Sequence, residues 1–497
     1  MVVGIRFGTR GRAIAVLATC VALLAACSSS SKPAATNTST TGKSGVTSPG
    51  VTTPDVAKPL AVEWMPSYAA PGTPAKYNTV GVIKVGLSDA KNVLVLEPGT
   101  LAGGAYFVPL AQEIVNKAPD WQVWSIERRE NLIEDQSKLN LAKQGKATTT
   151  ELYNYYLGFL KDPKITPHLQ IPPATAYPYA KQWGMKVAVE DLNTVLTAAK
   201  KVGGKVVLGG HSLGGSVVAA YATWNFAGHP GARDLAGLVF IDGSSFRTET
   251  AAQAQSALND LNAATATPWL TFGSIPSPYA GLFVMTGSEG ALIDPNSPSI
   301  GQKFALLPAG LKPSVPVTNL GQFGFALNAT ADENATQMGL AASQAHLGRG
   351  IAAAGSVHGW DGTGALTPIK RFAAMFAAPG IQNVDGSEWY FPQRLTDDTG
   401  AVGNGIANPA QAVLNVHSTF GRSLPRRLRM YAFSTSLGSH FVIDAVHQLA
   451  KQSHIPSRNV ILINRANTYA HNDPNSAYPH NVFFDRLVPM LRSIGAG

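Results

Sequence analysis

The sequence predicts an α/β fold built on a mostly parallel sheet flanked by helices. Short, nearly unbroken runs of Val, Leu and Ile end in turn residues, and stretches with helical spacing separate several of them. Unbroken apolar runs are typical of strands covered on both faces. Strand–helix–strand alternation indicates parallel strands.

Four strands are expected in the first half of the chain, and a helix over 187–201 lies between the second and the third. The four strands are expected at 92–96, 121–126, 205–208 and 238–241. The pattern resumes with a strand at 429–433, a helix over 440–451, a strand at 459–463 and a last amphipathic helix over 482–494.

Between these two blocks the chain is rich in Ala, Gly and Pro. A structureless loop of this length is implausible in a compact domain, so a large, mostly helical cap is expected. It would be inserted between the strand ending at Ile241 and the strand near Arg429. The predicted parts are a core over 61–245, a cap over 246–425 and a second core segment over 426–497.

The first residues have the three parts of an export signal: a basic start, an apolar run and small residues at the end. The stretch Leu24-Ala25-Ala26-Cys27 resembles a bacterial lipobox, whose cysteine is acylated. We expect a lipoprotein signal over 1–26, a flexible Ser/Thr/Pro-rich tether over 27–60, and a lipid anchor on Cys27 at the outer face of the cell membrane. An ordinary cleaved signal is the alternative.

Composition excludes several classes of function. The 497 residues are 45% hydrophobic and 14% charged, with a formal net charge of +9. The basic residues form no long run. A nucleic-acid partner is therefore not expected. Cys20 and Cys27 are the only cysteines, so no disulfide is available to the mature chain. A cysteine nucleophile and a cysteine-rich zinc site are excluded as well.

The segment Gly210-x-Ser212-x-Gly214 has the pattern of a nucleophile elbow. Such a serine stands on a tight strand-to-helix turn, where glycines remove clashes with Cβ atoms. Here a buried strand precedes the motif and small residues follow it, including Ser216 and Ala219. This context favours Ser212 as a nucleophile over a Gly-rich turn without chemistry.

On these residues the chain resembles the α/β-hydrolase superfamily over about 75–245 and 425–497. The form Gly-His-Ser-Leu-Gly is common among its lipases and esterases. The resemblance implies the chain order nucleophile, acid, histidine. His471 lies in the loop where the superfamily keeps its base, and His480 in the same loop is the alternative. His211 is expected to pack beside the elbow.

The resemblance leaves the acid more open. The superfamily most often places it after the strand that ends here at Phe433, but the next residues contain no carboxylate. Some lipases place it one strand earlier, where Asp242 follows the strand ending at Ile241. Asp444 and Asp473 are the alternatives.

The resemblance also implies two backbone N–H donors for an oxyanion. Leu213 would supply one and Thr100, in the loop after the strand at 92–96, the other. A metal site could be formed by His440, Asp444 and His447, whose spacing places them on one face of the expected helix. No fourth ligand is indicated, so neither a metal nor a cofactor is expected.

These residues predict a serine hydrolase that cleaves carboxylic esters of small molecules or lipids through an acyl-enzyme. A cell-envelope acyltransferase with the same triad, a silent lipid-binding lipoprotein and an amide-cleaving enzyme are the alternatives. The sequence indicates neither the acyl chain length nor an oligomeric state.

Overall fold

The computed structural model describes residues 60–497 except 246–247, 305–306, 330–343 and 354. The predicted export signal, Cys27 and the tether lie outside the described residues. Among the described residues, no helix is both long enough and apolar enough to span a bilayer.

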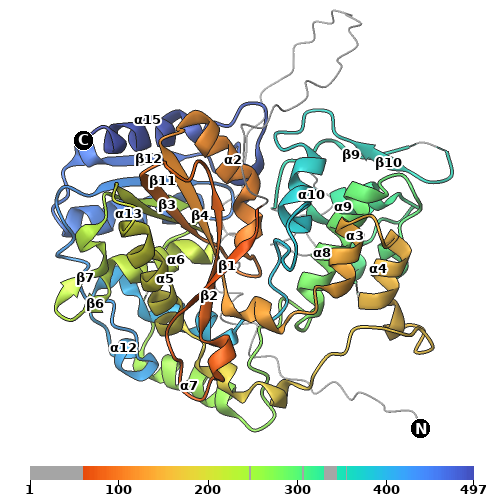
Figure 1. The fold of residues 1–497 in the computed structure, drawn as a ribbon, viewed down its shortest axis with the longest axis horizontal. Coiled ribbons are helices and arrows are strands. Elements are labelled where there is room, and N and C mark those ends of the chain that lie inside the picture. Colours follow the sequence, from red (N-terminus) through yellow and green to blue (C-terminus); the bar gives the residue numbers. More distant parts are fainter. Residues whose placement is uncertain (1–59, 246–247, 305–306, 330–343, 354) are drawn as a thin grey trace, which may run out of the picture. The chain divides into compact units, whose positions relative to one another are not determined.

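An eight-stranded sheet forms the centre of the described domain (Figure 1). β1 pairs antiparallel with β2, β2 pairs antiparallel with β4, and the remaining pairs are parallel. The strands, in their order across the sheet, are β1 Val62–Pro66, β2 Thr79–Val85, β4 Trp121–Glu127, β3 Asn92–Glu97, β5 Val206–His211, β8 Gly237–Ile241, β11 Arg429–Ser434 and β12 Val460–Asn464. This order is that of the α/β-hydrolase fold, and the predicted fold class is confirmed.

Helices cover both faces of the sheet, as the unbroken apolar strands predicted. In β3, Val93 and Val95 join the core formed with α5, α6 and α13, while Leu94 and Leu96 join the core formed with α2 and α15. The helices are α2 Val108–Lys117, α5 Met185–Lys200, α6 Leu213–Thr223, α13 Ser439–Gln452 and α15 Phe484–Gly495. This double cover buries the central strands along their length, while the edge strands β1 and β12 stay partly exposed.

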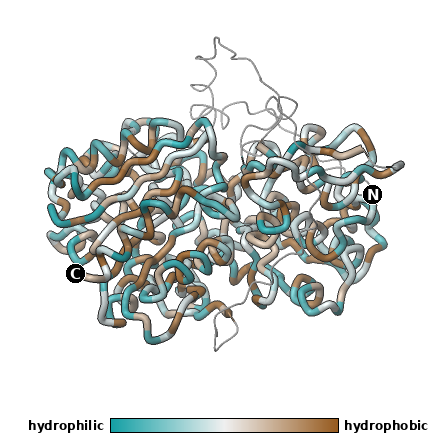
Figure 2. The backbone as a smooth tube through the Cα atoms, turned by 90° about the horizontal axis from the view of Figure 1, so that it is seen from above, coloured by the Kyte–Doolittle hydropathy of each residue, from teal (hydrophilic) through white to brown (hydrophobic). Residues whose placement is uncertain are grey.

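A second group of elements lies beside the sheet (Figures 1 and 2). Its α9 and α10 pack into the core with α2, whereas α4 and α8 share a core distinct from the two at the sheet. Leu152 and Tyr156 of α4 share this core with Leu282 and Met285 of α8 and with Trp389. The group contains α3 Ser137–Lys143, α4 Thr149–Tyr156, α8 Tyr279–Ile293, α9 Asn319–Leu327, β9 Gly350–Ala352, β10 Gly359–Asp361 and α10 Ile369–Ala377. Two separate segments of the chain therefore build it.

Other helices from the 246–425 stretch stay with the main domain. α7 packs against α12, and α11 contacts both α7 and α5. Their bounds are α7 Ala251–Asn262, α11 Gln393–Asp397 and α12 Pro409–Leu414. Two further short elements are α14 Asp473–Ser476 and the hairpin of β6 Asn225–Phe226 and β7 His229–Pro230.

Candidate active site

Ser212 stands at the sharp turn between β5 and α6. Its φ of 57° and ψ of −127° lie in a region that non-glycine residues rarely adopt. A Cβ on Gly214 would lie 2.7 Å from Pro98 O, and one on Gly210 would meet the backbone of Gly214. Close backbone approach therefore requires both glycines of the motif, as an elbow demands.

Asp242 and His471 form a hydrogen-bonded pair beside this turn. His471 Nδ1 lies 2.6 Å from Asp242 Oδ2, and both side chains are buried. Nδ1 donates to the carboxylate, which leaves Nε2 as the free nitrogen of the ring. The structure therefore joins the predicted base to the predicted acid.

The loop after β11 holds the Asp242 carboxylate. Oδ1 accepts hydrogen bonds from Thr435 N at 2.7 Å and from Gly438 N at 3.1 Å, and Oδ2 accepts one from Thr435 Oγ1. Burial raises the pKa of Asp242, but the bonds from His471 and Thr435 outweigh it and hold the pKa below its ordinary value. The loop after β11 contains no carboxylate over 434–438 and instead supplies donors to Asp242 at the end of the neighbouring strand.

Ser212 lies against the same strand end. Its N–H donates to Ile241 O at 2.9 Å, and a Cβ on Gly243 would lie 2.7 Å from Ser212 Cα. His211 Nε2, from the residue before Ser212, lies 2.9 Å from His471 O. No hydrogen bond joins Ser212 Oγ to His471 in the described part of the chain, so their proximity rests on these neighbouring contacts.

The alternative residues lie elsewhere or are engaged elsewhere. His480 is exposed, and so are His440, Asp444 and His447 on α13. Asp473 accepts from His346 Nδ1 at 2.6 Å and from Thr367 Oγ1 at 2.7 Å. Across residues 60–497, outside the gaps, no three His, Cys, Asp or Glu side chains converge for a metal ion.

The loop after β3 covers the elbow. A Cβ on Gly99 would lie 2.7 Å from Ser212 Cβ, so this loop touches the serine. The N–H of Thr100 donates to no group among the described residues. Leu213 is the first residue of α6, where an N–H has no partner within the helix. Neither N–H is engaged within the described chain, and the role of the two groups as oxyanion donors stays a prediction.

The sequence did not indicate the role of Arg128, which binds the carbonyl oxygens of this loop. Its Nη1 donates to Gly99 O at 3.2 Å and to Ala102 O at 2.9 Å. Its Nη2 donates to Pro98 O and, at 3.0 Å, to Glu97 Oε1. Three loop carbonyls are thus fixed by one buried guanidinium.

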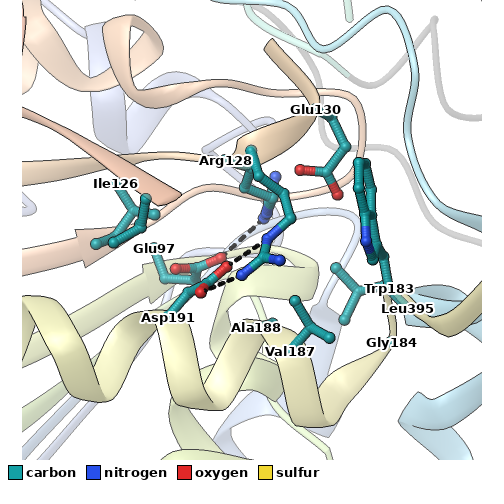
Figure 3. A pocket seen from close by; sticks show the side chains of 12 residues that line it. Glu97, Ile126, Arg128, Glu130, Trp183, Gly184, Val187, Ala188, Asp191 and Leu395 are labelled. Carbon is teal, nitrogen blue, oxygen red and sulfur yellow. Dashed lines mark hydrogen bonds and ion pairs between the residues drawn. The ribbon is translucent and has the colours of Figure 1, made fainter. Parts of the chain in front are cut away.

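Buried carboxyls surround Arg128, and a small cavity lies among Glu97, Glu130 and Trp183 (Figure 3). Burial raises the pKa of Glu97 and of Glu130 to about 7, although Arg128 acts in the opposite direction. Burial raises the pKa of Glu127 to about 8, although Gly104 N donates to its Oε2 at 2.6 Å. Within the described chain, neither oxygen of the fully buried Glu388 has a hydrogen-bond partner. Arg128 and these buried carboxyls therefore form a charged and partly protonated cluster beside the loop after β3.

No protein-family model matches the sequence, and the search of curated proteins finds no relative. Several solved structures are similar. One is the thioesterase domain from the curacin biosynthetic pathway, at 10% identity and a TM-score of 0.39, over 88% of this chain and 100% of that one. Another is a soluble variant of monoglyceride lipase from Saccharomyces cerevisiae, at 9% identity and a TM-score of 0.37, over 84% of this chain and 92% of that one.

A carboxylesterase from Nitrososphaera gargenis is also similar, at 12% identity and a TM-score of 0.34, over 86% of this chain and 98% of that one. These likenesses concern the fold, and the assignment of the site rests on its own geometry.

Proposed function

We propose that this protein is a serine hydrolase that cleaves carboxylic esters through Ser212, His471 and Asp242. The observation that carries the proposal is the 2.6 Å bond between His471 Nδ1 and Asp242 Oδ2 at the strand end against which Ser212 packs. A strained serine, a buried His–Asp pair and unpaired N–H groups are the parts that acyl transfer needs.

In the proposed reaction His471 Nε2 takes the proton of Ser212 Oγ as Oγ attacks the ester carbonyl. The N–H groups of Leu213 and Thr100 stabilise the oxyanion, and Asp242 stabilises the imidazolium. The bond between the carbonyl carbon and the alcohol oxygen then breaks, and the alcohol leaves with the proton from His471. Water activated by His471 releases the acid and restores Ser212.

The test is hydrolysis of p-nitrophenyl esters of about two to sixteen carbons by wild type, Ser212→Ala and Ser216→Ala. Ser216 lies one turn further along α6 and donates to Ser244 O, so it controls for loss of a buried hydroxyl. We expect kcat to fall by about 10³-fold or more in Ser212→Ala and by less than tenfold in Ser216→Ala. Equal activity of wild type and Ser212→Ala would refute the proposal.

Product analysis with an added alcohol separates hydrolysis from acyl transfer. Free acid as the main product at every alcohol concentration supports the hydrolase. A transferred ester as the main product would favour the acyltransferase instead.

We also propose, on the sequence alone, that the chain is exported and acylated at Cys27. The lipobox-like stretch Leu24-Ala25-Ala26-Cys27 supports this. Metabolic labelling with a fatty-acid analogue should mark the full chain and should be lost in Cys27→Ser, while ester hydrolysis persists.

A further inference from the structure

His211 is held in a network that the reaction above does not use. Its Nε2 lies 2.9 Å from the backbone oxygen of His471, and the two imidazole rings lie 4.3 Å apart, centroid to centroid. Its Nδ1 lies 3.0 Å from Tyr106 Oη. Tyr106 Oη in turn accepts from Asn475 Nδ2 at 2.7 Å and contacts the side-chain amide of Asn472.

The contacts of the ring fix its tautomer. A carbonyl oxygen can only accept, so Nε2 carries the hydrogen that bonds to His471 O. His211 is buried, and burial, together with the neighbouring His471, lowers its pKa to about 3. The ring is therefore neutral, and its Nδ1 is an acceptor that faces the Tyr106 hydroxyl.

Tyr106 Oη also contacts Asn472 Oδ1, and the amide nitrogen of Asn472 donates to Gln344 Oε1 at 2.5 Å. The single hydroxyl hydrogen of Tyr106 therefore has two acceptors within reach, Asn472 Oδ1 and His211 Nδ1. The network then runs from Asn472 and Asn475 through Tyr106 and His211 to His471 O.

We infer that His211 is a positioning residue that holds the backbone of the base, His471, against the elbow. The inference rests on the proposed function. A hydrogen-bond donor of zero net charge suits this place, because His471 becomes positive when it takes the serine proton. A cation in the position of His211 would oppose that step.

Two substitutions of His211 separate positioning from mere packing. His211→Phe keeps a flat ring but removes the donor, whereas His211→Gln keeps an N–H at similar reach. We expect His211→Phe to lower kcat for a p-nitrophenyl ester 10- to 100-fold with KM within about twofold. The apparent pKa of the acid limb of kcat/KM should fall, because His471 is held less firmly on Asp242. His211→Gln should recover most of both effects.

A substrate-independent readout is the rate of labelling by a fluorophosphonate. In that reaction the Ser212 Oγ–phosphorus bond forms, the phosphorus–fluorine bond breaks, fluoride leaves and His471 accepts the serine proton. His211→Phe should slow labelling in parallel with kcat. Tyr106→Phe, which leaves the elbow unchanged, should slow it about three- to tenfold.

The outcomes are distinct. If wild type neither hydrolyses esters nor is labelled, the proposed function fails and the positioning role fails with it. If wild type reacts and His211→Phe reacts within twofold of it, only the positioning role is wrong. Equal losses in His211→Phe and His211→Gln, with unchanged pH profiles, would also reduce His211 to a packing residue.

Discussion

The residues that support the two sides of Ser212 differ in charge. On the histidine side, the Asp242 carboxylate holds the ring of His471, and Tyr106, His211 and Asn475 support its backbone through hydrogen bonds between groups without net charge. On the oxyanion side, the loop is held by the cation of Arg128 among buried carboxyls. The contrast indicates that each support is matched to what its side must do.

The histidine side must accept a new positive charge in each turnover of the proposed reaction. Groups without net charge hold the backbone of His471 in place without repelling the imidazolium that forms there. The loop of residues 98–102 only has to stay still, so a strong charged clamp serves it well. The cost is that the clamp depends on pH, because several of its carboxyls have raised pKa values.

The largest expected effect breaks the histidine side. Asp242→Asn places an amide beside His471 Nδ1 and forces the wrong tautomer, so kcat should fall by about 10³- to 10⁴-fold in ester hydrolysis. Asp473→Asn is the matched control, since Asp473 is a buried aspartate bonded instead to His346 and Thr367. We expect a loss below tenfold there. A larger loss in the control than in Asp242→Asn would transfer the role of the acid to Asp473.

The next prediction removes the cation of the Arg128 clamp. Arg128→Met leaves Glu97 without its cation and frees the carbonyls of Gly99 and Ala102. The free energy of unfolding in urea at pH 7, followed by tryptophan fluorescence, should fall by about 3–5 kcal/mol.

The matched control for Arg128 is Lys200→Met, which removes a half-exposed cation paired with Asp234. That change should cost less than about 0.5–1 kcal/mol. Equal costs in the two variants would show that the Arg128 clamp adds no stability.

On these two sides the sequence could predict only features that are formed by residues close together in the chain. The elbow at Ser212 and the six parallel strands are continuous patterns of neighbouring residues, and the structure has those strands within a few residues of the prediction. β1 and β2 were not predicted, because Glu63 and Lys84 interrupt these antiparallel strands at one edge of the sheet. Asp242 could be proposed only from its place at the end of a strand.

The supports were not predicted because distant residues create them. The charged run at 127–130 has the composition of a solvated turn, yet it is buried and contacts the segment at 385–389: Arg128 Nη1 lies 3.9 Å from Glu388 Oε2. Thr435 and Gly438 reach Asp242 from almost 200 positions away. No periodicity in the sequence marks such contacts.

The charged cluster and Asp242 should respond to pH in opposite directions. Glu127 has a pKa raised from 4.5 to about 8, so its contribution to stability is complete below about pH 4.5 and is lost as pH rises through 8. Asp242 has a lowered pKa and acts in the opposite direction, losing its contribution in acid.

The variant Glu127→Gln should therefore match wild type near pH 5 in the free energy of unfolding. Near pH 8 it should exceed wild type by about 2–4 kcal/mol. Glu63→Gln, which alters an exposed ion pair with Lys84, should show no such rise. Parallel curves for wild type and Glu127→Gln would show that the buried cluster holds no extra proton.

Substitutions at Thr100 test whether the loop acts through its backbone. The proposed donor at Thr100 is an N–H, so Thr100→Ala should change kcat less than threefold, whereas Thr100→Pro removes that N–H and should cost about 10²- to 10³-fold. Both variants are measured on the same p-nitrophenyl ester. A loss in Thr100→Ala as large as in Thr100→Pro would assign the donor to the hydroxyl. If Thr100→Pro retains full activity, Arg128 holds a loop that supplies no donor, and the charged side serves stability alone.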